Sequence, residues 1–147
     1  MLSKIFNMQK ELNIMVNADT NGGTLEDREK LFFQYAFALS QEASELLDCS
    51  DWKWWSKVVK ENPDKQFRAI ADFENAKIEA IDILFFLTSI FQILGMTPED
   101  VLKIYEMKWK VNVDRQKADY DIRFKTEDDN NRIKEEIKKS NRTTFVD

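Results

Sequence analysis

The sequence of 147 residues contains no histidine, one cysteine, two prolines and three glycines. With so few chain breakers, we expect long helices rather than short strands joined by turns. The missing histidine excludes di-iron sites built on Glu-x-x-His and the zinc sites of His-rich hydrolases. Because Cys49 is the single cysteine, no disulfide forms within one chain, as is typical of a reducing cytosol. We interpret Cys49 as a buried, inert thiol, since the sequence supplies no histidine base to activate it.

The chain also lacks a basic excess and a membrane-length apolar run. Its net charge of −5 argues against binding duplex nucleic acid through the phosphates, because counterion release requires a positive surface. The most apolar stretch, residues 80–96, is shorter than a membrane span and carries Asp82, Ser89 and Gln92. We therefore expect a helix buried in protein and no membrane partner. The N-terminus is too polar for a signal peptide, which favours a cytoplasmic location.

The composition that is present, 43% hydrophobic and 33% charged, fits one globular domain. Helix signals include a capping box beginning at Thr24, a C-terminal cap at Gly95 and an N-terminus at Thr97. They predict helical segments at about residues 3–17, 24–47, within 50–65, 65–94 and 97–116. Residues 121–147 are strongly charged and have too little apolar surface for a core element. The predicted fold is an all-α bundle of four to five helices over residues 1–120, followed by a charged tail over 121–147.

Two pairs of acidic residues are each spaced three positions apart: Glu42 with Glu45, and Glu79 with Asp82. On a helix, residues at this spacing face the same way. Either pair alone is typical of the solvated edge of an amphipathic helix. Together they require another explanation, because Asp82 lies in an apolar run and four converging carboxylates repel one another unless a cation joins them. An oxygen-preferring ion, Mg²⁺ first, is predicted, and an all-oxygen site in a helical bundle indicates phosphate chemistry.

A second polar pattern runs along the predicted helix 97–116. Tyr105, Lys108, Asn112 and Arg115 fall within an arc of about 80° at the border of an apolar face. By itself such a stripe is more often solvated surface. Beside a metal cluster it is a candidate phosphate clamp, with Arg115 bidentate and Lys108 a point charge.

The first helical segment places Phe6, Gln9 and Asn13 on one face. Amides next to an aromatic ring suit a nucleobase, because each amide offers a donor and an acceptor. Ordinary surface amides explain the spacing equally well. The tryptophans at 52, 54 and 55 have two possible roles, which are stacking on a base and packing in the bundle. Packing is the more frequent role of such side chains.

In order along the chain, these motifs resemble the all-α nucleotide pyrophosphatase superfamily, and within it the dimeric dUTPases and the related phage dCTPase–dUTPases. The resemblance rests on MQKELN (8–13), EASELLD (42–48), WKWW (52–55), ENAKIEAIDILFF (74–86) and KWKVNVDRQKADY (108–120). The chain departs from the family pattern at Phe85, where many relatives have histidine, and at Ser56, where a basic residue is common. These departures leave the acidic motifs intact and bear on the substrate.

The resemblance implies a helical homodimer that hydrolyses a deoxynucleoside triphosphate to the monophosphate and pyrophosphate, with about two or three Mg²⁺ ions per site. It implies metal binding by Glu42, Glu45, Glu79 and Asp82. It also implies roles in substrate binding for further residues: Gln9 and Asn13 at the base, Lys53, Lys108 and Arg115 at the phosphates, and Trp55, Asn112 and Tyr120 at the sugar or phosphate end. For the catalytic base we predict Glu42, with Glu45 as the second choice.

The substrate remains open at this point because a side-chain amide can rotate and exchange donor for acceptor. dUTP is the first choice, mixed dCTP/dUTP the second, and a broader MazG-like activity the third. A rival from another class is a non-catalytic helical protein that binds a partner, with residues 127–141 as the binding segment. The complete set of four carboxylates favours the enzyme, because a pure binder does not need it.

Overall fold

The computed structural model describes residues 1–20, 22–53, 55–61, 70–117 and 128–142. Within these residues all regular secondary structure is helical, and an antiparallel bridge pairs Ser50 with Ile70 outside any strand. The predicted all-α class is therefore confirmed. The chain divides into two compact units, Met1–Met96 and Thr97–Asp147.

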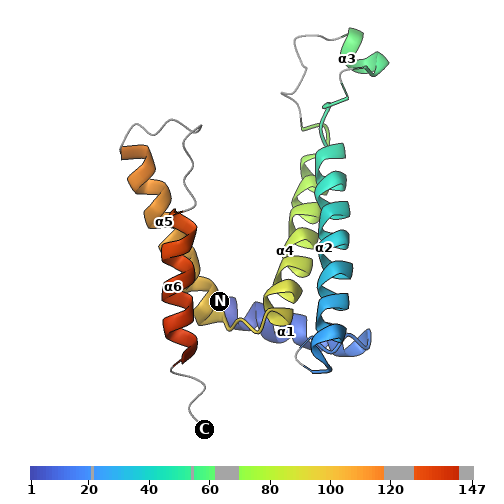
Figure 1. The fold of residues 1–147 in the computed structure, drawn as a ribbon. Helices are drawn as coiled ribbons and strands as arrows, with labels where there is room; N and C mark the ends of the chain where they lie inside the picture. Colours follow the sequence, from blue (N-terminus) through green and yellow to red (C-terminus); the bar gives the residue numbers. More distant parts are fainter. Residues whose placement is uncertain (21, 54, 62–69, 118–127, 143–147) are drawn as a thin grey trace. The chain divides into compact units, whose positions relative to one another are not determined.

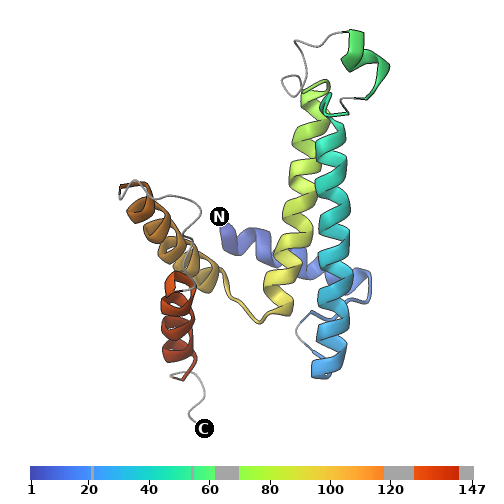
Figure 2. The ribbon, with the colours of Figure 1, turned by 45° about the horizontal axis from the view of Figure 1, so that its top comes forward.

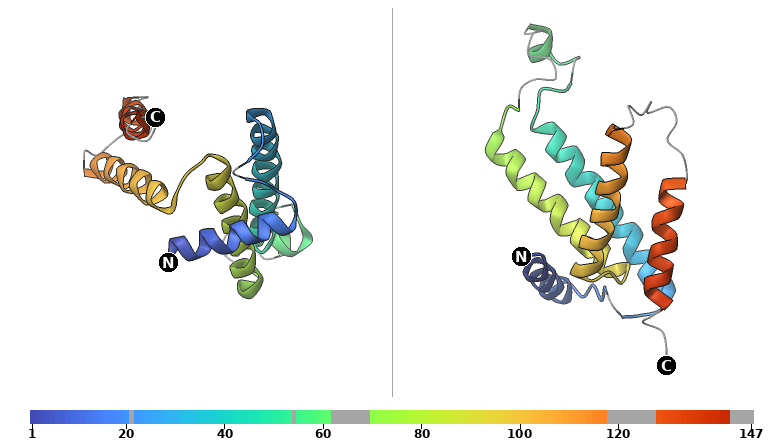
Figure 3. Two further views of the ribbon diagram at one scale, coloured as in Figure 1. Left: turned by 90° about the horizontal axis from the view of Figure 1, so that it is seen from below. Right: turned by 90° about the vertical axis from the view of Figure 1, so that its left-hand side faces the viewer.

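The first unit contains α1 (Leu2–Met15), α2 (Leu25–Asp48), α3 (Lys57–Glu61) and α4 (Phe73–Ile93). α2 and α4 run side by side in opposite directions (Figure 1 and Figure 2). α1 lies across the end of this pair, against the C-terminal part of α4 (Figure 3). This antiparallel pairing places the second half of α2 beside the first half of α4.

Local sequence signals explain where these helices begin and end. Thr24 Oγ1 accepts a hydrogen bond from Asp27 N at 3.2 Å and Asp27 Oδ2 accepts one from Thr24 N at 2.9 Å, which confirms the capping box. Gly95 follows α4 with a φ of 71°, a left-handed conformation that favours glycine. The predicted start of α4 at about residue 65 falls outside the described residues. Within them, Asp72 caps a helix that begins at Phe73, by accepting a hydrogen bond from Asn75 N at 2.9 Å.

Aromatic contacts join the three long helices of the first unit. Tyr35 on α2 meets Phe86 on α4 edge to face at 6.0 Å between ring centroids. Phe6 on α1 is buried and stacks on Phe91 at 6.3 Å, so its ring is occupied by protein packing. In the described part of the chain, no single helix is long and apolar enough to cross a membrane. Only α4 taken together with the next helix, Pro98–Lys117, as a bent pair passes that test of length and composition.

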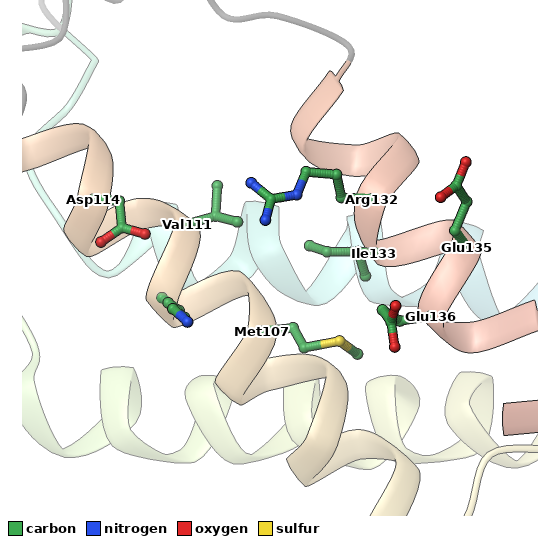
Figure 4. A pocket seen from close by; sticks show the side chains of 8 residues that line it. Met107, Val111, Asp114, Arg132, Ile133, Glu135 and Glu136 are labelled. Carbon is green, nitrogen blue, oxygen red and sulfur yellow. The ribbon is translucent and has the colours of Figure 1, made fainter. Parts of the chain in front are cut away.

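The second unit contains α5 (Pro98–Lys117) and α6 (Asp128–Arg142). Thr97 and Asp100 form a capping box at the start of α5, as the sequence indicates. α6 differs from the expectation of a tail without a core element, because Ile133 is buried where α6 packs against α5. A cavity of about 360 Å³ adjoins this contact, with Met107 and Val111 on the α5 side and charged side chains at its edges (Figure 4).

Candidate metal centre

Three of the four predicted ligand carboxylates meet across α2 and α4. Glu42 and Glu45 on α2 and Glu79 on α4 each offer an oxygen atom within 4.8 Å of the others. Glu79 is buried, Glu42 is half-buried and Glu45 is exposed. Asp82 lies one turn beyond Glu79 on α4 and is half-buried outside this group of three. The two acidic pairs therefore reach the same place because antiparallel helices bring them together.

The charges of this cluster act on Glu42. Burial raises the pKa of Glu42 above its ordinary value, and the negative charges of Glu45, Asp82 and Glu79 raise it further, in that order. Asp82 is thus one of the charges that act on Glu42, although it lies outside the group of three. A hard divalent cation fits this donor set, since it prefers carboxylate oxygens and offsets their mutual repulsion.

Two side-chain amides hold carboxylates of the cluster. Gln41 Nε2 donates to Glu45 Oε1 at 3.0 Å on the exposed side of α2. Asn75 Nδ2 donates to Glu79 Oε1 at 3.0 Å and to the sulfur of Cys49 at 3.3 Å. Cys49 is buried, as predicted. The acidic spacing in the sequence did not indicate a role for Asn75, although its position one turn before Glu79 places both residues on one face of α4.

The predicted base-binding residues Gln9 and Asn13 lie at the other end of α4. Both are buried, with 4% and 2% of their surface exposed. Gln9 Nε2 donates to Asn13 Oδ1 at 3.1 Å and to Ser89 Oγ at 2.9 Å. Tyr35 donates its hydroxyl hydrogen to Asn13 Oδ1 at 3.1 Å, and burial raises the pKa of Tyr35, which keeps that hydrogen in place. We call these side chains, together with Thr20 and Gln92, the amide network.

A backbone carbonyl fixes the orientation of the amides in this network. Gln92 Nε2 donates to the carbonyl oxygen of Phe6 at 2.8 Å, and since a carbonyl only accepts, Gln92 must turn its own oxygen toward Asn13. Asn13 then donates from Nδ2 to Gln92 Oε1 at 3.1 Å and accepts from Gln9 with Oδ1. Consequently Gln9 Oε1 faces away from Asn13. Among the described residues, Gln9 Oε1 is the one buried side-chain oxygen or nitrogen that has no hydrogen-bond partner.

The sequence pattern did not predict the other members of the amide network, which are Thr20, Tyr35, Ser89 and Gln92. One signal was present, because Ser89 and Gln92 interrupt the apolar run of α4 one turn apart. Polar side chains buried in such a run need hydrogen-bond partners, and those partners come from another helix. Which helix supplies them is decided by packing.

Lys53 and Trp55 lie in the connection that follows α2. Lys53 Nζ forms an ion pair with Asp48 Oδ1 at 2.9 Å and lies 5.5 Å from the centre of the Trp52 ring. Hydrogen bonds from Lys53 and Trp52 lower the pKa of Asp48. Trp55 is half exposed and meets Trp52 edge to face at 5.5 Å. Trp52 and Trp55 thus pack on each other, while Trp54 lies outside the described residues.

The remaining predicted residues belong to the second unit. Lys108 Nζ donates to Asn130 Oδ1 at 2.9 Å, which joins α5 to α6. Asn112 is exposed and borders a cavity of about 450 Å³ beside Trp109. Arg115 is half-buried on the same helix. Tyr120 lies outside the described residues, so its predicted role stays a prediction.

Comparison with known proteins adds to this geometry. A family profile described as dUTPase matches residues 1–92, a span that includes the carboxylate cluster and the amide network and ends before α5. The dCTP pyrophosphatase of Enterobacteria phage T4 is 34% identical over 71 residues, which are 47% of this chain and 42% of the phage protein. The matched stretch therefore spans less than half the length of that relative. No solved structure matches.

Proposed function

Because this chain belongs to the dUTPase family, a family of nucleoside triphosphate pyrophosphatases, we propose that it hydrolyses a deoxynucleoside triphosphate, first of all dUTP, to the monophosphate and pyrophosphate. The observation that carries the proposal is the convergence of Glu42, Glu45 and Glu79 within 4.8 Å, inside the matched segment. Such a group of carboxylates is hard to explain as a structural feature alone, since like charges at this separation oppose folding.

In this proposal Glu42, Glu45, Glu79 and Asp82 hold about two or three Mg²⁺ ions. When bound, Mg²⁺ neutralises charge on the triphosphate and makes a bound water more acidic. In this proposal Glu42 accepts the proton of the attacking water. Glu45 is the second choice for the base.

Gln9 and Asn13 meet the base in this proposal. The orientation of the network leaves Gln9 Oε1 as the acceptor that can take a hydrogen from a ligand. Uracil carries a hydrogen on its ring nitrogen N3, whereas the same nitrogen of cytosine is itself an acceptor and would be repelled at that place. This supports dUTP as the first choice. Because Gln9 is buried, base binding has to open the packing beside α1.

A second candidate substrate is dCTP, alone or together with dUTP. The similarity to the phage dCTP pyrophosphatase favours it. Cytosine would satisfy Gln9 Oε1 with its exocyclic amino group instead of its ring nitrogen. A broader MazG-like activity on several deoxynucleoside triphosphates is the third candidate.

The phosphates and the sugar are assigned to residues outside the cluster. Lys53, Lys108 and Arg115 supply positive charge to the phosphates in this proposal, and Arg115 has the bidentate geometry that phosphate oxygens accept. Trp55, Asn112 and Tyr120 meet the sugar or phosphate end. The catalytic domain then extends over residues 1–120 and is followed by the charged residues 121–147, whose helix α6 packs against α5.

We also propose that the protein is a homodimer. Large apolar side chains on α2 are exposed, with Phe33 at 72% and Phe37 at 80% of their surface. An exposed apolar surface of this kind is typical of an interface between protein chains. Size-exclusion chromatography with light scattering tests the proposal, and a single-chain mass at micromolar concentration contradicts it.

The function is tested by measuring pyrophosphate release from a panel of deoxynucleoside triphosphates, with Mg²⁺ and with a chelator. We expect release from dUTP first, loss of release with the chelator, and little release from purine substrates. A preference for dCTP selects the second candidate. Absence of release from every substrate, or release that the chelator leaves unchanged, contradicts the proposal.

A further inference from the structure

We propose that Asn75 is a positioning residue for Glu79 and that Cys49 fixes Asn75 in place. The proposal rests on the metal site proposed above and concerns how the protein prepares that site. Neither residue carries a charge that would bind a cation. Both act through the orientation of a carboxylate that does.

The side chain of Asn75 uses both hydrogens of its Nδ2 atom. One goes to Glu79 Oε1 at 3.0 Å and the other to Cys49 Sγ at 3.3 Å. A carboxylate that is held at one oxygen cannot rotate freely, while its second oxygen stays able to bind a cation. Asn75 therefore fixes the direction in which the buried Glu79 presents its carboxylate to Glu42 and Glu45.

Asn75 is itself held on two sides. Its backbone N–H donates to the capping side chain of Asp72 at 2.9 Å. Its amide contacts the sulfur of Cys49, whose position is fixed because the Cys49 carbonyl oxygen accepts from Ala71 N at 2.8 Å. Cys49 also donates its S–H to the carbonyl oxygen of Glu45 at 3.4 Å. Cys49 thus connects the end of α2, next to Glu45, with the start of α4, next to Asn75.

A matched pair of amides lies in the same cluster. Gln41 donates to Glu45 at 3.0 Å, the same distance as the bond from Asn75 to Glu79. The Gln41 bond is exposed, where water can replace it, whereas the Asn75 bond is part-buried and has the sulfur of Cys49 beside it. Hydrogen bonds that orient metal ligands change metal affinity by about 10–100-fold when they are removed. Loss of the Asn75 bond should therefore weaken metal binding, whereas loss of the Gln41 bond should not.

The test measures Mn²⁺ affinity by electron paramagnetic resonance on the full chain without nucleotide, so that the readout is independent of turnover. The variants are Asn75→Leu, which removes the donor and keeps a side chain of similar size, Asn75→Ala, which removes the donor without adding bulk or charge, and Gln41→Leu as the exposed control. We expect the dissociation constant for Mn²⁺ to rise by about tenfold or more in both Asn75 variants and by less than about twofold in Gln41→Leu. Thermal unfolding with a chelator present checks that each variant is folded.

The outcomes separate this proposal from the proposed function. Failure of the wild-type protein to bind Mn²⁺ overturns the metal site and this proposal with it. Binding by the wild type, with equal affinity in folded Asn75→Leu, overturns only the role of Asn75. Weaker binding in Asn75→Leu but wild-type binding in Asn75→Ala indicates that the leucine side chain disturbs the site by its bulk, and this result also overturns the role of Asn75. If Asn75→Leu does not fold, Asn75→Ala decides, because it lacks the donor and adds neither bulk nor charge.

Discussion

The two ends of α4 carry polar groups of opposite kinds. Near its start, Glu79 meets the charged pair of α2, with Asp82 one turn further along α4, and this site reaches the surface through Glu45. Near its end, Ser89 and Gln92 meet the neutral amides of α1, and the amide network is almost fully buried. Neutral amides can be buried when their hydrogen bonds are made, whereas like charges need water or a cation. We expect the first site to serve chemistry and the second to serve both stability and recognition.

The largest effect is expected at the charged end. Glu45→Gln removes one negative charge and one metal oxygen ligand, and turnover should fall by at least about a thousandfold, ~4 kcal/mol in the barrier. Pyrophosphate release measures it, with circular dichroism to show that the helices remain. Wild-type turnover in the folded variant would rule out the assignment of Glu45.

For the free energy of unfolding, the larger effect is expected at the amide network. Asn13→Leu leaves the hydroxyl of Tyr35 without its acceptor and removes the hydrogen bonds that Asn13 makes with Gln9 and Gln92, at a cost of about 3 kcal/mol in the free energy of unfolding. Urea denaturation measures the loss. Thr24→Ala, which breaks the exposed capping box, is the control and should cost about 1 kcal/mol. Equal losses of stability in the two variants would show that the amide network stabilises the fold no more than the capping box does.

A smaller effect is expected on base selection. Gln92→Leu removes the donor that engages the carbonyl oxygen of Phe6, so the amides of Asn13 and Gln9 are less firmly held in one orientation. The ratio of kcat/KM for dUTP to that for dCTP should fall by about fivefold, ~1 kcal/mol. A folded variant with an unchanged ratio would disprove the link between the network and base choice. The same variant should leave Mn²⁺ affinity unchanged, because the carboxylates lie at the other end of α4.

The smallest effect is the pH dependence of stability without metal. The raised pKa of Glu42 means that the folded protein binds this proton more tightly than the unfolded chain does, whose value is near 4.5. The contribution of Glu42 to stability is therefore favourable at low pH and is lost as pH rises from about 4.5 through the folded pKa. Urea denaturation between pH 4 and 7 with a chelator measures it, and Glu42→Gln should flatten the curve. A curve equally steep in the variant would show that Glu42 does not sense its neighbours.

The sequence predicted the helical class and several helix ends, because these depend on nearby residues. The capping box at Thr24 and the left-handed Gly95 are determined within one turn of chain. It also predicted that Glu42 and Glu45 share a face, since helix geometry fixes that spacing. It did not predict the helix that buries Ile133, because one apolar contact per turn is a weak signal in a charged segment.

The tertiary structure decided everything that depends on which helix faces which. Only the antiparallel packing of α2 against α4 places Glu79 beside Glu42 and Glu45, and only that packing brings Cys49 to Asn75. The orientation of the Gln9 amide, which the sequence left undetermined, follows from the Phe6 carbonyl through Gln92 and Asn13. Spacing along a helix is a local property of the chain, whereas a contact between helices depends on how their apolar faces pack, and that is settled by the whole unit at once.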